Sequence, residues 1–161
     1  MNYKKLQLRI FFLSWLSYAF FYVSRKNFSI VKTTLNEELG FSMVQLGFIE
    51  TLYASSYMIG QFVSGALGDK FGPRRLLSYG MIGSAVTSIL MGGSISYSIF
   101  AFSLGFNGLF QSTGWSNNLK AMTPWFDQES RGKITGLWCT CYTAGPLIAT
   151  SLATWLLVSY G

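Results

Sequence analysis

The stretch that decides the fold is a short polar segment, residues 65–75, which reads Gly65-Ala66-Leu67-Gly68-Asp69-Lys70-Phe71-Gly72-Pro73-Arg74-Arg75. Its glycines and its proline permit a tight turn between two helices. Residues 44–67 before it are mostly apolar, and residues 76–119 after it contain no Asp, Glu, Lys or Arg. A helix that crosses a membrane needs about 20 mainly apolar residues. The turn therefore joins a segment long enough to cross once to one long enough to cross twice.

The rest of the chain has the same character. Half of its 161 residues are hydrophobic, only 11% are charged, and residues 134–160 form another uncharged segment. A soluble domain carries about 25% charged residues. We therefore predict an all-α integral membrane protein with five helical spans, at about residues 10–31, 44–67, 76–94, 99–119 and 134–158. Glycines or other small residues are frequent in the spans, which is typical of membrane helices packed in a bundle.

The basic residues indicate how the chain lies in the membrane. The net charge is +6, and Lys and Arg occur in short clusters between the apolar segments, so we expect no nucleic-acid partner. Positively charged loops stay in the cytoplasm. We predict a multi-pass protein of the cell (inner) membrane with a cytoplasmic amino terminus and with Gly161 on the far side. The clusters are Lys4, Lys5 and Arg9; Lys70, Arg74 and Arg75; and Lys120, Arg131 and Lys133.

Several chemical functions are not expected. The chain has no histidine, and its two cysteines, Cys139 and Cys141, are too closely spaced for a zinc site. On a helix they point about 200° apart and cannot form a disulfide. The sequence contains no nucleotide-binding glycine loop, no pair of catalytic acids and no arrangement typical of a nucleophile. We therefore expect no enzyme, no cofactor and no metal.

Arg25 and Lys26 fall inside the first apolar segment, about four-fifths of the way along residues 10–31 towards the outer end. A charge in a span is costly and usually marks a ligand site or an ion pathway. As an alternative, the span could end at Val23, with Arg25 in the interface. That span would have only 14 residues, and the apolar run continues after Arg25 through Phe28. The pattern favours a functional site.

Three polar side chains share a helix face with Arg25. Tyr22, Tyr18 and Ser14 precede it by three, seven and eleven residues. Tyrosines alone are also typical of the aromatic belt at a membrane interface. Aligned with an arginine, they are better interpreted as hydrogen-bond donors to an anion. The planar guanidinium suits phosphate.

Glu50 is the other charge within a predicted span, near its outer end. It could pair with Arg25 or Lys26, or take part in proton coupling. Placement in the outer interface, without a role in the site, is the interpretation that we favour.

Residues 65–75 resemble the loop signature of the major facilitator superfamily, G-x-x-x-D-[RK]-x-G-[RP]-[RK]-[RK]. The resemblance implies a helical bundle of twelve spans in two halves. Residues 1–161 would then be an incomplete amino-terminal half that needs the carboxy-terminal half in cis. Contacts of Asp69 with an arginine or a helix terminus could latch a gate in one conformer only. The predicted gating loop consists of Gly65, Asp69, Lys70, Gly72, Arg74 and Arg75.

Four further motifs resemble the organophosphate:phosphate antiporter family of that superfamily. They are Tyr22-x-x-Arg25-Lys26-Asn27-Phe28, Gln111-Ser112-Thr113-Gly114-Trp115, Trp125-Phe126 with Glu129-Ser130-Arg131-Gly132, and Gly136-Leu137-Trp138. The resemblance implies that Arg25 is one of two arginines that hold the substrate phosphate. Tyr18 and Tyr22 would assist it, and Trp115 and Trp138 would line the central cavity.

The sequence departs from the family pattern at positions around this site. Several members carry a lysine where Gln61 stands and a histidine where Tyr142 stands, and Ser116-Asn117 follows Trp115 where members often have two prolines. These departures leave the organic part of the substrate open. The predicted substrate-binding residues are Tyr18, Tyr22, Arg25, Lys26, Gln61, Trp115, Trp138 and Tyr142.

Three functions are compatible with these features. The first is a secondary transporter that exchanges a sugar phosphate or glycerol phosphate for inorganic phosphate by alternating access. The second is a membrane sensor for the same ligand, and the third is a porter for another organic anion. In each case we expect residues 1–161 alone to be inactive in transport, because they lack the second half.

Overall fold

The computed structural model describes residues 3–160, apart from the side chain of Asn27, and it confirms the all-α fold. The expected far-side position of Gly161 and the Asn27 side chain of the first-span motif lie outside the described residues. The elements are α1 (Tyr3–Glu37), α2 (Met43–Phe71), α3 (Pro73–Gly92), α4 (Tyr97–Gln111), α5 (Gly114–Met122), the 3-10 helix η1 (Thr123–Trp125), α6 (Gln128–Trp138) and α7 (Cys141–Tyr160).

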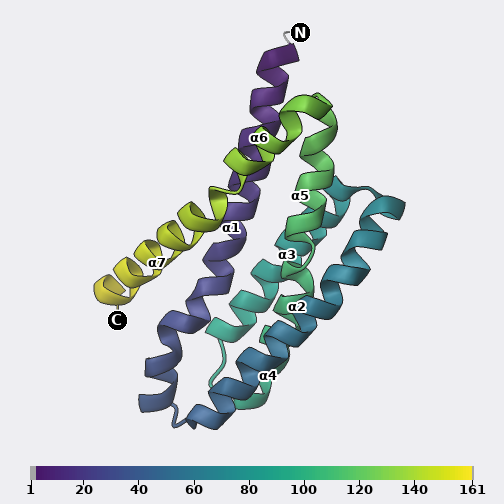
Figure 1. Cartoon of the computed structure of the whole chain (residues 1–161). Helices are drawn as coiled ribbons and strands as arrows, with labels where there is room; N and C mark the ends of the chain where they lie inside the picture. The colour runs from purple at the N-terminus through teal and green to yellow at the C-terminus, as the bar shows by residue number, and fades with distance from the viewer. Residues whose placement is uncertain (1–2, 161) are drawn as a thin grey trace.

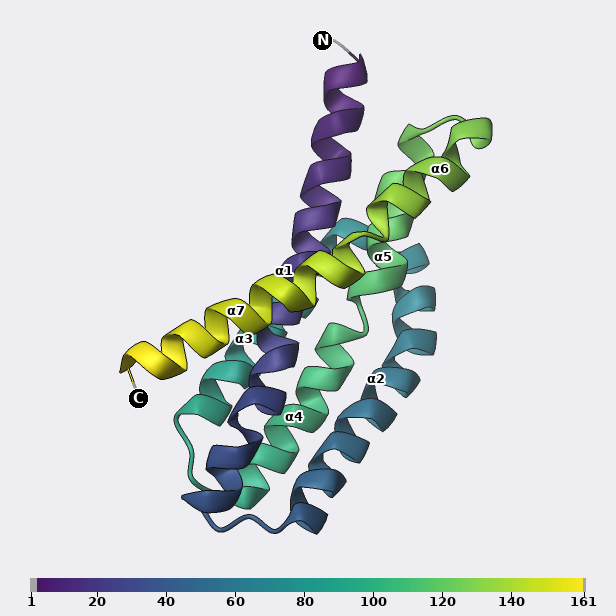
Figure 2. The ribbon, with the colours of Figure 1, turned by 60° about the vertical axis from the view of Figure 1, so that its left-hand side comes forward.

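The helices run side by side, so that residues far apart in sequence share one level of the bundle. Figures 1 and 2 show α1, α2, α3 and α4 lying alongside one another, with α7 crossing α1 obliquely. The helix α4 packs against both α2 and α3, and α7 packs against α1. Gly108 permits the close approach of α4 to α2, because a Cβ there would lie 2.6 Å from the carbonyl oxygen of Tyr53.

The turn between α2 and α3 is shorter than the sequence predicts. Residues 68–73 were expected to form a loop, but α2 continues to Phe71 and only Gly72 separates it from α3. Gly72 has a φ of 89°, which favours glycine, and Pro73 starts α3, where its missing N–H costs nothing. At the other end of α2, Ser42 and Gln45 form a capping box.

Two predicted spans are broken helices. Residues 99–119 were expected to form one helix, but α4 and α5 are separated at Ser112 and Thr113. Residues 134–158 are divided between α6 and α7, which are separated at Cys139 and Thr140. Hydroxyl groups donate back to carbonyls at both breaks: Ser112 Oγ to Leu109 O (2.6 Å) and Thr140 Oγ1 to Leu137 O (2.7 Å). Such bonds bend helices.

A layer of polar residues separates two apolar clusters. The first cluster is Phe28, Leu35, Phe41, Leu46, Ile49, Met91, Phe100, Ala101 and Leu104. The second is Tyr18, Phe21, Tyr22, Met122, Trp138, Cys141 and Ala149. Along α1, Ser24 and Arg25 lie between the two clusters. Because buried polar groups need partners, this layer is the part of the bundle in which a ligand site is expected.

The outer surface is apolar on every long helix. Phe62 of α2, Ile89 of α3, Phe102 of α4 and Val158 of α7 are each more than half exposed. Exposed apolar surface of this extent is typical of contact with lipid or with further protein. By length and hydropathy, two segments within residues 3–160, Tyr3–Glu37 and Gln128–Tyr160, are suited to cross a membrane. Five spans therefore remain a prediction.

Candidate anion-binding site

The centre of the site is the guanidinium of Arg25, which lies between helices α1, α2 and α4. Its Cζ atom lies 5.0 Å from the ring centroid of Tyr22 and 4.9 Å from that of Tyr57. Its Nη2 donates to Oε1 of Gln111 at 3.3 Å. Aromatic faces attract a cation without neutralising it. The side chain is thus held by neutral groups.

Gln111 fixes the position of Arg25. Its side chain is fully buried, and its Nε2 contacts Phe21 O at 3.0 Å, Ser24 Oγ at 2.6 Å and Ser84 Oγ at 2.9 Å. A backbone carbonyl can only accept a hydrogen bond, so the amide nitrogen must face Phe21. The amide oxygen therefore faces Arg25.

Arg25 lies deeper in the bundle than its position in the sequence predicts. We expected it four-fifths of the way to the outer end of the first span. The structure instead places it beside Tyr57, which is the middle residue of α2. The difference arises because α1 continues to Glu37, six residues beyond the predicted end. Arg25 is therefore at the mid-depth of α2.

A cavity of about 240 Å³ adjoins the guanidinium, lined by Arg25, Lys26, Ser29, Glu50 and Tyr53, among others. Arg25 Nε and the Tyr53 hydroxyl are buried and have no hydrogen-bond partner within residues 3–160. Neither Arg25 nor Lys26 forms an ion pair with a carboxylate of the described residues. A buried cation with unused donors is suited to bind an anion.

Four of the five predicted aromatic residues form one group, which contacts Arg25 through Tyr22. The Tyr18 ring lies 5.8 Å from Tyr22, 5.3 Å from Trp138 and 5.3 Å from Tyr142. Trp138 was expected to line the cavity, but its side chain is fully buried in this cluster, so it supports the tyrosines instead. Its Nε1 has no partner among the described residues.

The other two predicted residues lie apart from the guanidinium. Gln61 donates to the hydroxyl of Tyr57 at 3.0 Å and so contacts the site through that tyrosine. Trp115 of α5 is 42% exposed and does not line the cavity beside Arg25. Of the predicted residues, Tyr22 and Lys26 line the cavity beside Arg25, whereas Tyr18, Trp138 and Tyr142 pack together behind Tyr22.

Glu50 does not bind Arg25 or Lys26. Its Oε2 accepts from Lys32 Nζ at 2.9 Å, and both side chains are partly exposed. Lys32 lies in the part of α1 beyond the predicted first span, which explains why the sequence pattern did not indicate this pair. The pairing leaves the charge of Arg25 uncompensated.

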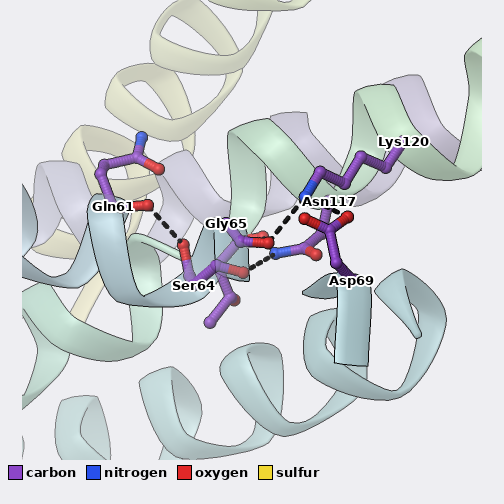
Figure 3. Close-up of polar contacts among 7 residues, drawn as sticks. Gln61, Ser64, Gly65, Asp69, Asn117 and Lys120 are labelled. Atoms are coloured by element: carbon purple, nitrogen blue, oxygen red, sulfur yellow. Dashed lines mark hydrogen bonds and ion pairs between the residues drawn. The ribbon is translucent and has the colours of Figure 1, made fainter. Parts of the chain in front are cut away.

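The predicted gating loop contacts α5 rather than an arginine. Asp69 accepts from Lys120 Nζ at 2.7 Å, and the same nitrogen donates to Gly65 O at 2.6 Å (Figure 3). One turn away, Asn117 Nδ2 lies 3.5 Å from Ser64 O. These contacts join the carboxy-terminal end of α2 to α5 beside the turn at Gly72.

The basic side chains of the predicted gating loop lie on the surface. The Lys70 ammonium lies 5.4 Å from the ring centroid of Phe71, and Arg74 and Arg75 are exposed. The sequence did not indicate Lys120 as the partner of Asp69, because the general excess of basic residues near the loops already accounts for a lysine at that position. It also missed Tyr53 and Tyr57, whose spacing of four places both beside Arg25.

The chain is similar to named transport proteins. It is 36% identical over 144 residues to the "Probable hexose phosphate transport protein" of Chlamydia pneumoniae, which covers 89% of this chain and 32% of that protein. It is 34% identical to an Arabidopsis thaliana protein whose name includes the words "glycerol-3-phosphate transporter 3", covering 98% of this chain and 35% of that protein. It is 31% identical to "Sugar phosphate exchanger 3" of Homo sapiens, covering 94% of this chain and 37% of that protein.

The similarity covers nearly the whole chain, which spans about a third of the length of these relatives. Residues 14–161 match the description "Major Facilitator Superfamily". The helical bundle, the polar layer inside it and the Gly65–Arg75 turn agree with that match. The chain therefore belongs to the Major Facilitator Superfamily and is a membrane protein.

Proposed function

We propose that the full-length protein is a secondary transporter that exchanges an organophosphate, a sugar phosphate or glycerol phosphate, for inorganic phosphate. The observation that carries the proposal is Arg25, a guanidinium at mid-depth in the bundle with no carboxylate partner among the described residues. The names of the relatives, which refer to hexose phosphate, glycerol-3-phosphate and sugar phosphate, support this substrate class. They favour transport over catalysis.

The geometry suggests how exchange would occur. A phosphate group would bind the free edge of the Arg25 guanidinium, with Tyr53 and Lys26 within reach on the cavity wall. Inorganic phosphate and a phosphate ester offer the same charged oxygens, so they would compete for one site. The organic group would extend towards residues that differ from the family pattern, Gln61 and Tyr142.

Opening and closing would use the contacts at the α2–α3 turn. The Asp69–Lys120 pair is exposed, so it contributes little stability by itself and can break at small cost. The second half of the transporter would rock against this bundle around the fixed arginine.

The proposal is tested by exchange in vesicles. We expect vesicles that hold the full-length protein and are loaded with inorganic phosphate to take up labelled glucose 6-phosphate or glycerol 3-phosphate. Vesicles without internal phosphate should take up far less, because obligatory exchange needs a counter-substrate. Saturable binding without flux would instead support the sensor, and uptake of carboxylates but not phosphate esters would support the porter for another anion.

We further propose that the amino terminus is cytoplasmic and the membrane is the cell (inner) membrane. The turn at Gly72 and the α3–α4 connection at Gly93 lie at opposite ends of α3. With Cys139 and Cys141 replaced by serine, we expect an impermeant thiol reagent applied outside to label Gly93→Cys but not Arg75→Cys. Arg75 is used as the inner site because the positive φ of Gly72 disfavours cysteine. Labelling of Arg75→Cys alone would contradict this orientation.

A further inference from the structure

A second cavity, of about 620 Å³, lies at the end of the bundle where the chain begins, between α1, α3 and α5. It is separate from the site at Arg25, with which it shares no lining residue. Two arginines, Arg9 of α1 and Arg74 of α3, line it, and most of its other walls are apolar, with Leu13, Leu77 and Met81 among them. The cavity therefore combines positive charge with a surface suited to hydrocarbon.

The charge is available to a ligand. Arg9 and Arg74 are exposed, and neither forms an ion pair or a side-chain hydrogen bond within residues 3–160. An arginine presents a planar set of donors that suits a phosphate group. Two arginines that line one cavity favour a phosphate diester or monoester over a neutral headgroup.

The charged residues of the cavity lie at its outer end, where the chain begins. Trp125 lies on its wall, and the backbone oxygen of Trp125 accepts from Tyr3 at 3.1 Å and from Gln7 at 2.6 Å. Aromatic rings of this kind are typical of the headgroup level of a bilayer. From Arg9 and Arg74, both α1 and α3 continue into the bundle, where Leu13, Leu77 and Met81 line the cavity together with Ser14, Ser17 and Asn118.

We propose that this cavity binds an anionic phospholipid of the cytoplasmic leaflet, with its phosphate between Arg9 and Arg74 and one acyl chain along Leu13, Leu77 and Met81. The cytoplasmic leaflet is rich in anionic lipids, and basic pockets between membrane helices on that side bind their headgroups. The proposal rests on the proposed cytoplasmic position of the amino terminus, but it does not depend on the transport activity. It assigns Arg74 a role in binding the lipid phosphate, which is separate from the gating role predicted from the sequence.

The experiment is native mass spectrometry of the full-length protein with added dioleoyl phosphatidylglycerol or dioleoyl phosphatidylcholine. We expect preferential retention of phosphatidylglycerol. The double variant Arg9→Gln/Arg74→Gln should lower its apparent affinity by about tenfold or more, since the loss of one charge-assisted hydrogen bond to the phosphate corresponds to a factor of about ten or more. Retention of phosphatidylcholine should change little.

The control is Lys4→Gln/Arg75→Gln, which removes the same charge from the same two helices at exposed positions that do not line the cavity. It should change the retention of phosphatidylglycerol less than about threefold, which is well below the loss expected of the double variant. Met81→Trp keeps both arginines but fills the apolar wall, so it should also lower retention of phosphatidylglycerol. Thermal unfolding of each variant shows whether it is folded.

Three outcomes would overturn the proposal. An equal loss in the control would mean attraction to general surface charge. No loss in the double variant would mean that another occupant, such as a further helix of the full-length protein, fills the cavity. Displacement of the lipid by water-soluble glycerophosphoglycerol would show a site for free phosphate esters, because that compound has the headgroup but no acyl chains.

Discussion

Replacing Arg25 by lysine is expected to weaken binding of phosphate esters by roughly ten- to a hundredfold, although the charge is kept. The guanidinium Cζ lies 5.0 Å from the ring centroid of Tyr22 and 4.9 Å from that of Tyr57, and Nε of Arg25 has no hydrogen-bond partner among residues 3–160. A lysine ammonium is a point charge that cannot form the same two-pronged contact. Losing one charge-assisted hydrogen bond costs about 1.5–3 kcal/mol.

The measurement is ligand affinity of the full-length protein, by competition of glucose 6-phosphate or glycerol 3-phosphate with labelled inorganic phosphate. Arg9→Lys is the matched control, because it makes the same chemical change on the same helix outside the site. It should bind these ligands like the parent. If Arg25→Lys binds them as well as the parent does, the phosphate is held elsewhere.

The arginine and its aromatic neighbours on α1 were predictable because they lie on one continuous helix. Spacings of three and seven residues fix a common face whatever the tertiary structure is. Tyr22 lies against Arg25 as expected. Tyr18 contacts Tyr22 and also packs against Trp138 of α6 and Tyr142 of α7, because α7 crosses α1 near that level. No pattern in the sequence predicts that α7 crosses α1.

Helix ends and breaks were less predictable. An uncharged apolar run such as residues 76–119 predicts helices that cross a membrane, but it contains no signal for a break at Ser112 and Thr113. Serine and threonine are common within membrane helices, where they bond back to the preceding turn. The sequence could not show which of them interrupt the helix, so α4 and α5 were expected as one span.

Partners from other helices were the least predictable part of the site. Gln111 belongs to a recognised motif, but its role depends on α1, α3 and α4 meeting at one level. Lys120 and Lys32 pair with Asp69 and Glu50 of a different helix, and neither pair follows from spacing along the chain. Spacing along the sequence predicts which residues share one face of a helix. It does not predict which residues of another helix contact that face, because this depends on how the helices pack.

Gln111→Glu is expected to reduce phosphate affinity by roughly a hundredfold or more, the other large effect that the structure predicts. The substitution keeps the size of the side chain but places a carboxylate oxygen where Oε1 now lies, 3.3 Å from Arg25 Nη2. An ion pair at about 4 Å contributes on the order of 4 kcal/mol at an effective dielectric constant of 20, before desolvation is subtracted. The phosphate would have to compete with that carboxylate for the same cation.

Two further variants separate charge from structure. Gln111→Met removes the hydrogen bonds without adding charge, and we expect it to weaken binding by only about tenfold, since a hydrogen bond to a charged group such as Arg25 contributes about 1.5 kcal/mol at the low end. Gln7→Glu makes the same chemical change at the end of α1, where Gln7 contacts Trp125, and it should leave affinity unchanged. The diagnostic result is a phosphate affinity far lower for Gln111→Glu than for Gln111→Met. The added charge lowers the affinity in this way only if Arg25 binds the anion. Equal losses for Glu and Met would mean that Gln111 merely supports the packing of α1 against α4, and that the anion does not bind at Arg25.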